Sequence, residues 1–578
     1  MSNIDLNKVI ARAREWTQAP FDEETRAQVE RMIEAGGDAL VESFYKDLEF
    51  GTGGMRGIMG IGTNRMNKYT IGKNTQGLAN YLKAKYPEKP LAVAVNYDVR
   101  HNSKDFARIV ADVLTANGIK VYLFEQFRPT PELSFAVRYF RADAGIVLTA
   151  SHNPPEYNGY KVYGADGAQV VPPDDKQIVD AIARVKFDDI RFDGRPELIQ
   201  YVGEALDEVY IKAAVEHATF GQRERSNVRI LFTSLHGTSI TIMPRAMQAA
   251  GFTDFHIVEE QAEPNGDFPT VKSPNPEEPE AFTMALKKAD EIGADIILAT
   301  DPDADRIAVA VRDDSGAMRL LNGNQTMAVM DQFLIDRWRE AGKIQGREFI
   351  ASTIVSTDLI MDIGAGEGVT VKRSLTGFKW IAKLIRENEG KLSFIGGGEE
   401  SFGYMVGDFV RDKDSITSGL LAAEIASYMK ARGESFFRFL TSIYERYGFY
   451  REHLVALVRK GLEGKAEIDA MMKKFRSQPP DVITGEKVVR IEDYLEGVIK
   501  DLETGKQTPI TDIPQSNVLI YYTGAGTKVA LRPSGTEPKI KFYFSVKMPF
   551  DSGKPFVEQD AAALKKINRI IDELGIDG

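Results

Sequence analysis

A local pattern that occurs three times along the chain constrains its fold most strongly. In each copy, a helix pattern with apolar residues at i, i+3 and i+4 precedes a short apolar strand, and a loop of small and polar residues follows. The strands read GIVLTA, ADIILAT and KLSFIGG, and the loops after them carry Ser151, Asp301 and Glu399. Helix and strand alternating at this spacing predict parallel α/β sheets, with ligands beyond the carboxyl ends of the strands. We therefore expect three related α/β domains facing a common cleft.

The two ends of the chain differ from this pattern. The N-terminal stretch is typical of polar helices, with Asp22 or Asp38 as helix caps. Near the C-terminus, strand-like segments surround a loop rich in Gly, Pro, Ser and Thr, and a charged amphipathic helix follows. The expected fold class is α/β: three related α/β domains with mixed sheets plus a smaller C-terminal α+β domain around a central active-site cleft. Composition shifts predict a helical extension, three α/β domains and the α+β domain at 1–48, 49–205, 206–325, 326–450 and 451–578.

Length and composition exclude several classes of protein. A chain of 578 residues is too long for one core, and its length predicts roughly three to four domains. No apolar run approaches the roughly 20 residues that cross a bilayer, and the charged first twenty residues lack a secretory signal. A net charge of -11 argues against nucleic acid as a partner, and the lack of cysteine suits a reducing compartment. We expect a cytoplasmic monomer or homodimer that binds neither membranes nor nucleic acid.

Ser151 is a candidate nucleophile. It ends an apolar strand, and the His-Asn-Pro-Pro that follows forces a turn, so the hydroxyl is presented at a strand tip. A turn-forming or helix-capping serine is the alternative. The pair Asn158-Gly159 is a hairpin signal that would return Lys161 toward the serine, where an ammonium group could assist deprotonation or neutralise a phosphate.

Asp301, Asp303 and Asp305 are candidate metal ligands. In extended backbone these alternating carboxylates would point to one side, and their mutual repulsion favours a bound cation. Oxygen donors suit magnesium, whereas an acidic surface turn is the alternative. An EF-hand is disfavoured because Arg306 and Arg312 occupy the positions that require Gly and Glu. Arg306 would add a second cation for a transferring phosphate.

Two further loops carry candidate binding residues. Glu399 and Ser401 follow a run of three glycines and could bind adjacent sugar hydroxyls, although a helix N-cap with an acidic first turn would look the same. A second loop offers a guanidinium fork, two hydroxyls and flexible backbone amides, which suit a phosphate monoester; a plain hairpin turn is the alternative. That loop contains Arg532, Ser534, Gly535 and Thr536.

Other familiar motifs are missing. No G-x-G-x-x-G follows a strand in a βαβ context, and the sequence contains neither a Walker phosphate loop nor a G-x-S-x-G elbow. The six histidines lack metal-ligand spacing, which disfavours zinc.

Taken together, TASHNPPEYNGYK, DPDADR, GGEESFGY and RPSGTEPK resemble, in order, the signature loops of the α-D-phosphohexomutase superfamily. The resemblance covers the chain from Phe50 onward. The strings FGTGGMRG and DFPTVKSPNPEEPE are most similar to the branch with longer phosphoglucomutases, phosphopentomutases and glucose 1,6-bisphosphate synthase. Pro302 and Ala304, which replace the glycines of many hexomutases between the aspartates, agree with that branch and leave the sugar open.

The resemblance implies roles for the candidate residues. Ser151 would carry a phosphoryl group, and Asp301, Asp303 and Asp305 would hold one Mg²⁺ per chain together with an oxygen of that phosphoserine. Glu399 and Ser401 would hold the sugar, and the loop with Arg532, Ser534, Gly535 and Thr536 would hold its non-reacting phosphate. Proton transfer or charge stabilisation would involve Lys161, His152, Arg56, Arg306 and Lys379, with His236 as a looser candidate.

The activity implied is interconversion of hexose 1-phosphate and hexose 6-phosphate, with glucose favoured over mannose. A hexose 1,6-bisphosphate would be both intermediate and activator, and small sugar phosphates the only partners. Phosphopentomutase or glucose 1,6-bisphosphate synthase activity is the alternative within the fold. A phosphatase that releases phosphate to water and a non-catalytic sugar-phosphate-binding protein are alternatives from other classes.

Overall fold

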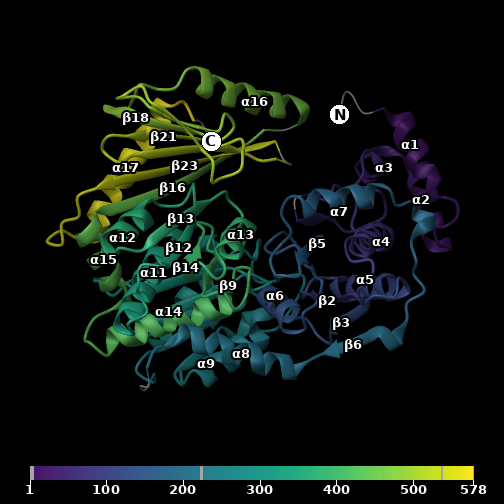
Figure 1. Cartoon of the computed structure of the whole chain (residues 1–578), viewed down its shortest axis with the longest axis horizontal. Coiled ribbons are helices and arrows are strands. Elements are labelled where there is room, and N and C mark those ends of the chain that lie inside the picture. Colours follow the sequence, from purple (N-terminus) through teal and green to yellow (C-terminus); the bar gives the residue numbers. More distant parts are fainter. Residues whose placement is uncertain (1–4, 52, 222–224, 460, 536–537, 577–578) are drawn as a thin grey trace. The chain divides into compact units, whose positions relative to one another are not determined.

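The computed structural model describes residues 5–51, 53–221, 225–459, 461–535 and 538–576. The chain divides into two compact units, each described by itself below (Figure 1). Unit 1 contains residues 1–326 and 378–436, and unit 2 contains residues 327–377 and 437–578. Among the helices described, none is both long and apolar enough to span a membrane.

Unit 1 begins with three short helices, α1 (Leu6–Glu15), α2 (Glu23–Ala35) and α3 (Gly37–Phe44). Asp22 caps α2, because its side chain accepts a hydrogen bond from the Thr25 amide at 2.9 Å. Asp38 instead lies in the first turn of α3, so its prediction as a cap is wrong; Gly36, at a φ of 61° that favours glycine, both ends α2 and begins α3.

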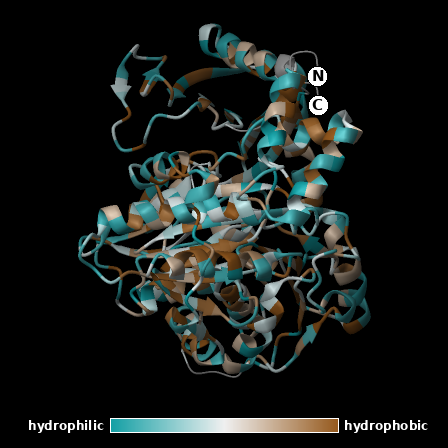
Figure 2. Ribbon diagram, turned by 90° about the vertical axis from the view of Figure 1, so that its right-hand side faces the viewer, coloured by the Kyte–Doolittle hydropathy of each residue, from teal (hydrophilic) through white to brown (hydrophobic). Residues whose placement is uncertain are grey.

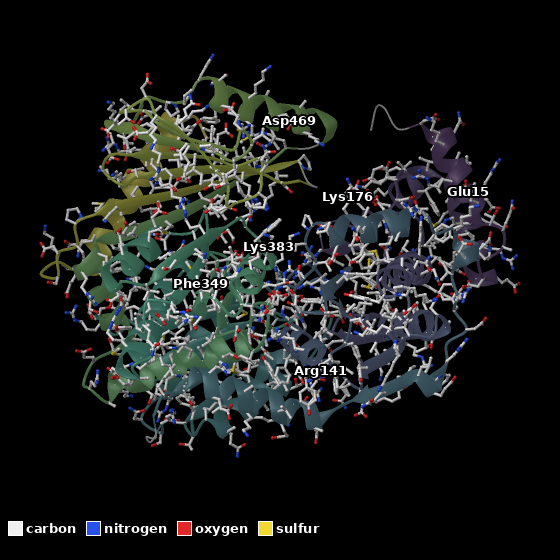
Figure 3. All side chains as sticks on the ribbon, viewed as in Figure 1. Glu15, Arg141, Lys176, Phe349, Lys383 and Asp469 are labelled. Atoms are coloured by element: carbon white, nitrogen blue, oxygen red, sulfur yellow. The ribbon has the colours of Figure 1, made fainter. Side chains whose placement is uncertain are left out.

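Trp16 packs this helical layer onto the rest of unit 1. Its ring lies 4.4 Å from Phe21, 5.6 Å from Tyr69 and 5.3 Å from Phe187, measured between centroids. Tyr69 belongs to α4 (Lys68–Lys85), so the contact joins the N-terminal helices to the first sheet's helical cover. Glu15 lies on the exposed face of α1 (Figure 3).

The first sheet of unit 1 is mixed. Its strand order is β1-β5-β4-β2-β3-β6, in which β2, β3, β4 and β6 are parallel while β5 and β1 run antiparallel to their neighbours. The strands are β1 (Gly54–Ile58), β2 (Ala92–Tyr97), β3 (Lys120–Phe124), β4 (Ala144–Leu148), β5 (Tyr157–Gly164) and β6 (Ile199–Val202).

Helices cover both faces of this sheet. Val93 and Val95 point to the face packed by α4, α5 (Ser103–Ala116) and α7 (Asp174–Ala183), whereas Ala94 points to the face packed by α6 (Thr130–Tyr139). Because both faces are covered, β4 is buried throughout, as its continuous apolar sequence predicts. Figure 2 shows the hydrophobic residues gathered within such layers and the hydrophilic ones on the outer helices.

The second sheet repeats the same plan, in the order β11-β10-β9-β7-β8. Its strands are β7 (Ile230–Thr233), β8 (Phe255–Ile257), β9 (Ile296–Thr300), β10 (Ile307–Arg312) and β11 (Met318–Leu320). Parallel β9 is followed by antiparallel β10, just as β4 is followed by β5. The helices of this region are α8 (Glu204–Ala218), α9 (Met243–Ala249) and α10 (Thr283–Ile292); α10 packs on one face through Ala285 and Ala289.

The third repeat contributes strands to both units. In unit 1, β14 (Ser393–Gly398) pairs antiparallel with β15 (Tyr404–Val406), beside α13 (Phe378–Asn388) and α14 (Ser415–Lys430). In unit 2, β12 (Glu348–Thr353) and β13 (Thr370–Ser374) are parallel, with α12 (Leu359–Glu367) between them. The helix α11 (Gly323–Glu340) precedes β12 along the chain.

The C-terminal part of unit 2 is an antiparallel sheet with flanking helices α15 (Phe436–Tyr447), α16 (Gly461–Ser477) and α17 (Phe556–Glu573). The strand order is β16-β23-β22-β21-β18-β19-β20, with β17 (Val482–Ile483) paired to β18. The bounds are β16 (Phe449–Val458), β18 (Glu486–Asp493), β19 (Val498–Asp501), β20 (Gln507–Pro509), β21 (Leu519–Thr523), β22 (Lys528–Pro533) and β23 (Lys539–Met548). The observed sheets confirm the α/β class and the smaller C-terminal α+β part.

Replacing Trp16 by alanine tests how the N-terminal layer is held. The side chain is 1% exposed, and truncating a buried tryptophan costs about 3 kcal/mol or more. We expect amide hydrogen exchange across 6–44 to accelerate in Trp16→Ala. The control Leu6→Ala removes a side chain that is 51% exposed on the same helix and should leave exchange unchanged. Equal exchange in both variants would contradict the packing described here.

Candidate active site

Ser151 lies at the point where β4 ends and the chain turns toward β5. Its backbone adopts a φ of 52°, an uncommon value for a residue with a side chain, and its amide donates to Thr149 Oγ1 at 2.8 Å. The serine Oγ donates to Asp301 Oδ2 at 2.7 Å and lies 3.1 Å from His152 Nδ1. The loops that carry Ser151 and Asp301, 150 positions apart in sequence, are therefore in direct contact.

Asp301, Asp303 and Asp305 form the one cluster of possible metal ligands found among the described residues. Each offers an oxygen within 4.8 Å of the others, and all three side chains are buried. Their backbone is a turn with Ala304 at a φ of 58°, not the extended chain that we expected, so a turn rather than alternation brings the carboxylates together.

This donor set fits a hard divalent cation. Asp303 Oδ1 and Asp305 Oδ1 are buried without a hydrogen-bond partner, which is costly unless something else satisfies them. Asp301 Oδ1 is instead held by the amides of Asp305 and Arg306, at 3.1 and 3.0 Å. Three clustered carboxylates, two of them with an unpaired buried oxygen, offer the oxygen donors that such a cation binds.

Two lysines flank the carboxylates. Lys161 Nζ lies 2.8 Å from Asp303 Oδ2 and 3.3 Å from Asp305 Oδ2, and Lys413 Nζ lies 3.0 Å from Asp305 Oδ2. Lys161 was predicted from the sequence, whereas Lys413, which follows β15 and precedes α14, was not. Its charged string, RDKDS, carries no spacing that would have identified it.

Lys161 reaches the site by a different route from the one expected. Asn158 and Gly159 lie inside β5, so the hairpin turn predicted at this pair is wrong. Glycine is needed at 159 because a Cβ there would come within 2.3 Å of the Thr149 carbonyl oxygen. On β5, Lys161 pairs with Val147 of the antiparallel neighbour β4, which is the strand that leads into the serine loop.

Burial and charge shift the pKa values of these groups in opposite directions. Burial, together with the charges of Asp303 and Asp305, raises the pKa of Asp301 well above its usual value. Burial alone would also raise the pKa of Asp303, but the charge of Lys161 outweighs it and the pKa is lowered. Burial and the charge of Arg306 hold the pKa of His152 well below its usual value, so its imidazole is neutral near pH 7.

Two predicted arginines lie beside these loops. Arg306 pairs with Glu277, and its Nε lies 4.0 Å from Asp305 Oδ1. Glu277 was not identified as a site residue, although it belongs to the string DFPTVKSPNPEEPE. Arg56, on β1, donates to Asn153 Oδ1 at 2.9 Å and so contacts the serine loop.

Glu399 and Ser401 follow β14, and backbone contacts tie their loop to Arg306. Arg306 and Gly403 form an isolated bridge, and the Ile307 amide donates to the Phe402 carbonyl at 3.0 Å. Glu399 and Ser401 do not cap a helix, because a turn and then β15 follow them. Glu399 is buried.

The remaining candidates are more scattered. Lys379 lies in the first turn of α13, where burial lowers its pKa. Both ring nitrogens of His236 are engaged, with Glu263 O and Thr270 Oγ1 at 2.9 Å each, so this histidine holds a loop of the second repeat. In unit 2, Arg532 lies near the end of β22, where its guanidinium lies 3.5 Å from the Tyr543 hydroxyl. The Ser534 amide donates to Lys539 O at 2.7 Å and Gly535 is exposed, whereas Thr536 lies outside the described residues.

Comparison with known proteins identifies the family of the chain. Family models for phosphoglucomutase/phosphomannomutase alpha/beta/alpha domains I, II and III match residues 47–189, 208–316 and 322–447, more than half of the chain. The chain belongs to the phosphoglucomutase/phosphomannomutase family. The three related α/β domains and the superfamily resemblance are thereby confirmed, whereas the branch within the superfamily stays a prediction.

Curated relatives define the activity more closely. A phosphoglucomutase of Staphylococcus haemolyticus is 39% identical over 525 residues, covering 88% of this chain and 94% of that protein. One from Staphylococcus aureus (strain USA300) is 39% identical over 538 residues, covering 90% and 96%. At this level of identity the chain is a phosphohexose mutase of the phosphoglucomutase type, an intramolecular phosphotransferase.

Solved structures share the fold. The phosphoglucomutase parafusin from Paramecium has a TM-score of 0.68 at 18% identity, covering 92% of this chain and 95% of that one. A phosphoglucomutase/phosphomannomutase family protein from Burkholderia thailandensis has a TM-score of 0.64 at 18% identity, covering 91% and 97%.

Changing Asp303 to asparagine tests the metal site. The substitution removes one negative charge from the ligand set, so we expect at least about tenfold weaker apparent affinity for the divalent cation. Titrating activity and direct binding with metal measures the change. The control Asp290→Asn removes an exposed carboxylate on α10, 71% exposed, and should leave the titration unaltered. An unchanged midpoint in Asp303→Asn would remove that residue from the ligand set.

Proposed function

We propose that this family member interconverts glucose 1-phosphate and glucose 6-phosphate through a phosphoryl group carried on Ser151. The contact that carries the proposal is the 2.7 Å hydrogen bond from Ser151 Oγ to Asp301, which places a hydroxyl against a buried carboxylate cluster. The identity to phosphoglucomutases supports glucose as the sugar. We assign Mg²⁺ to the cluster because its donors are all oxygens, with Asp301, Asp303 and Asp305 as ligands. When bound, the ion supplies positive charge that stabilises the transferring phosphoryl group.

The reaction runs in two transfers. In the first, the bond between phosphorus and Ser151 Oγ breaks as the free sugar hydroxyl forms a new bond to phosphorus; the hydroxyl proton passes to a neighbouring base, and the leaving Ser151 Oγ takes up a proton. The product is glucose 1,6-bisphosphate. In the second transfer, Ser151 Oγ loses that proton to the base as it attacks the other phosphate of this intermediate, and the sugar oxygen that leaves takes up a proton. Both transfers need the same serine, so it ends each cycle phosphorylated, and added bisphosphate would activate any enzyme that has lost its phosphate.

The charged neighbours of Ser151 suit the proton and charge movements. The serine proton is directed at Asp301, and His152 Nδ1 lies 3.1 Å from the serine oxygen, within reach for proton exchange during the transfers. Lys161, beside Asp303, can move a proton or offset charge. Arg306 can stabilise negative charge that develops on the phosphoryl oxygens. We assign Arg56 and Lys379 as further cations that stabilise the charge of the phosphate groups.

We assign sugar and distal phosphate recognition to the other two loops. Glu399 can accept hydrogen bonds from sugar hydroxyls and Ser401 can both donate and accept. A guanidinium and hydroxyls recognise any phosphate monoester, and the distal loop must hold the 1- and the 6-phosphate in turn. That loop contains Arg532, Ser534, Gly535 and Thr536.

We also propose a cytoplasmic location, which suits a chain without cysteine, and small sugar phosphates as the substrates. A monomer or homodimer is expected, and light scattering during gel filtration measures which one forms.

Replacing Ser151 by alanine tests the covalent step. We expect turnover in a coupled glucose 1-phosphate assay to fall to background, because the phosphoryl carrier is gone, while binding of glucose 1-phosphate persists. Intact mass should show one phosphate on the parent enzyme and none on the variant. The control Ser315→Ala changes an exposed serine and should behave like the parent. Unchanged turnover in Ser151→Ala would end the proposal, and release of free phosphate in step with substrate loss would make the enzyme a phosphatase.

The sugar is tested by comparing glucose 1-phosphate with ribose 1-phosphate. We expect kcat/KM to favour glucose 1-phosphate by at least about tenfold, which corresponds to about 1.4 kcal/mol of difference in transition-state binding. A pentose preference would support phosphopentomutase activity. Accumulation of glucose 1,6-bisphosphate as the end product would support the synthase.

A further inference from the structure

The loop that presents Ser151 has no regular secondary structure between β4 and β5, yet its geometry must be held accurately. Its backbone includes the φ of 52° at Ser151, and such conformations persist only where surrounding contacts enforce them. One side chain outside the loop donates hydrogen bonds to several of its carbonyl groups. That side chain is Arg100, which follows β2.

We infer that Arg100 is a positioning residue that holds the serine loop in its reactive geometry. Its guanidinium donates to four carbonyl oxygens of one short segment: Ser151 O at 2.7 Å, Pro154 O at 2.8 Å and Tyr157 O at 3.1 Å, together with Asn153 O. The rigid fork of donors on arginine can bind several acceptors at once, which the single ammonium of lysine cannot do with the same geometry.

Arg100 is itself held in place from two sides. Its Nε lies 3.3 Å from Asp98 Oδ2, and both side chains are buried. Asp98 Oδ1 in turn accepts hydrogen bonds from the Arg100 amide at 2.9 Å and from Ser103 Oγ at 2.8 Å. These hydrogen bonds hold Asp98 in place, and its charge lies beside the buried guanidinium.

The Arg100 guanidinium also contacts the second repeat. Arg100 Cζ lies 5.0 Å from the ring centroid of Phe268, a buried residue with a φ of 49° in the same string that supplies Glu277. Arg100 therefore joins the serine loop of the first repeat to the segment of the second repeat that pairs with Arg306. Its hydrogen bonds go to the backbone of the loop and not to the serine hydroxyl, whereas its charge also interacts with Asp301 and Asp303. A variant that keeps the charge therefore isolates the effect that passes through the backbone of the loop.

The inference rests on the proposed role of Ser151. Arg100→Lys keeps the charge and loses the fork, and Arg100→Gln removes both. We expect kcat to fall about a hundredfold in each, because a displacement of the nucleophile of about 1 Å has an effect of that size, while KM for glucose 1-phosphate changes less than threefold. Amide exchange across 149–159 should accelerate in both variants.

Arg225→Gln is the matched control. Arg225 is also a buried arginine of unit 1, paired with Glu424 at 2.6 Å and donating to the carbonyl of Ala250 at 3.4 Å, but it contacts no residue of the serine loop in the described structure. We expect this variant to lose stability while keeping kcat and the exchange of 149–159. Should Arg100→Gln fail to fold, Arg100→Lys is judged by the same criteria.

Two outcomes would overturn the inference: a kcat within threefold of the parent in Arg100→Lys, or a loss of kcat without faster exchange of 149–159, which would show that Arg100 does not act by holding the loop. Failure of the proposed function is seen separately, as a parent enzyme without phosphate on Ser151 or an active Ser151→Ala variant.

Discussion

The site depends on holding three carboxylates together in a buried place. Asp301, Asp303 and Asp305 repel one another, and burial strengthens that repulsion because little solvent screens it. Lys161 and Lys413 offset part of the charge, whereas burial and the charges of Asp303 and Asp305 raise the pKa of Asp301. A divalent cation would favour the ionised form of all three groups. The serine hydroxyl donates to this same carboxylate, so the nucleophile and the cation site share one group.

The three repeats build their loops in the same way. In each, a strand ends, a turn follows and the next strand returns antiparallel, as in β4–β5, β9–β10 and β14–β15. Each turn contains a residue other than glycine at positive φ, namely Ser151, Ala304 and Phe402. Such backbone costs about 1–3 kcal/mol at each position and is retained where a side chain or carbonyl must be aimed accurately. The strain therefore falls on the nucleophile loop, the carboxylate loop and the loop with Glu399.

The sequence was most informative where chemistry follows directly from residue type and position. Strand ends placed Ser151 and the three aspartates on loops, and the buried character of β4 and β9 followed from continuous apolar runs. Local rules misplaced the turn at Asn158-Gly159, because a glycine that permits a close backbone approach looks the same as one that permits a turn. Lys413 and Arg100 were missed because their partners lie far along the chain, and no local pattern encodes a contact between distant segments. The distal loop with Arg532 belongs to unit 2, so its role rests on residue type alone.

The charge balance suggests an order of binding. Three carboxylates face two lysines, Lys413 also pairs with Asp412 at 3.3 Å, and the charge of Arg306 is matched by Glu277. Before a cation binds, the carboxylate cluster therefore carries more negative charge than its lysines offset, which disfavours a phosphate dianion beside it. Two positive charges at the carboxylates would offset this excess close to the serine oxygen and would favour the entry of phosphate there.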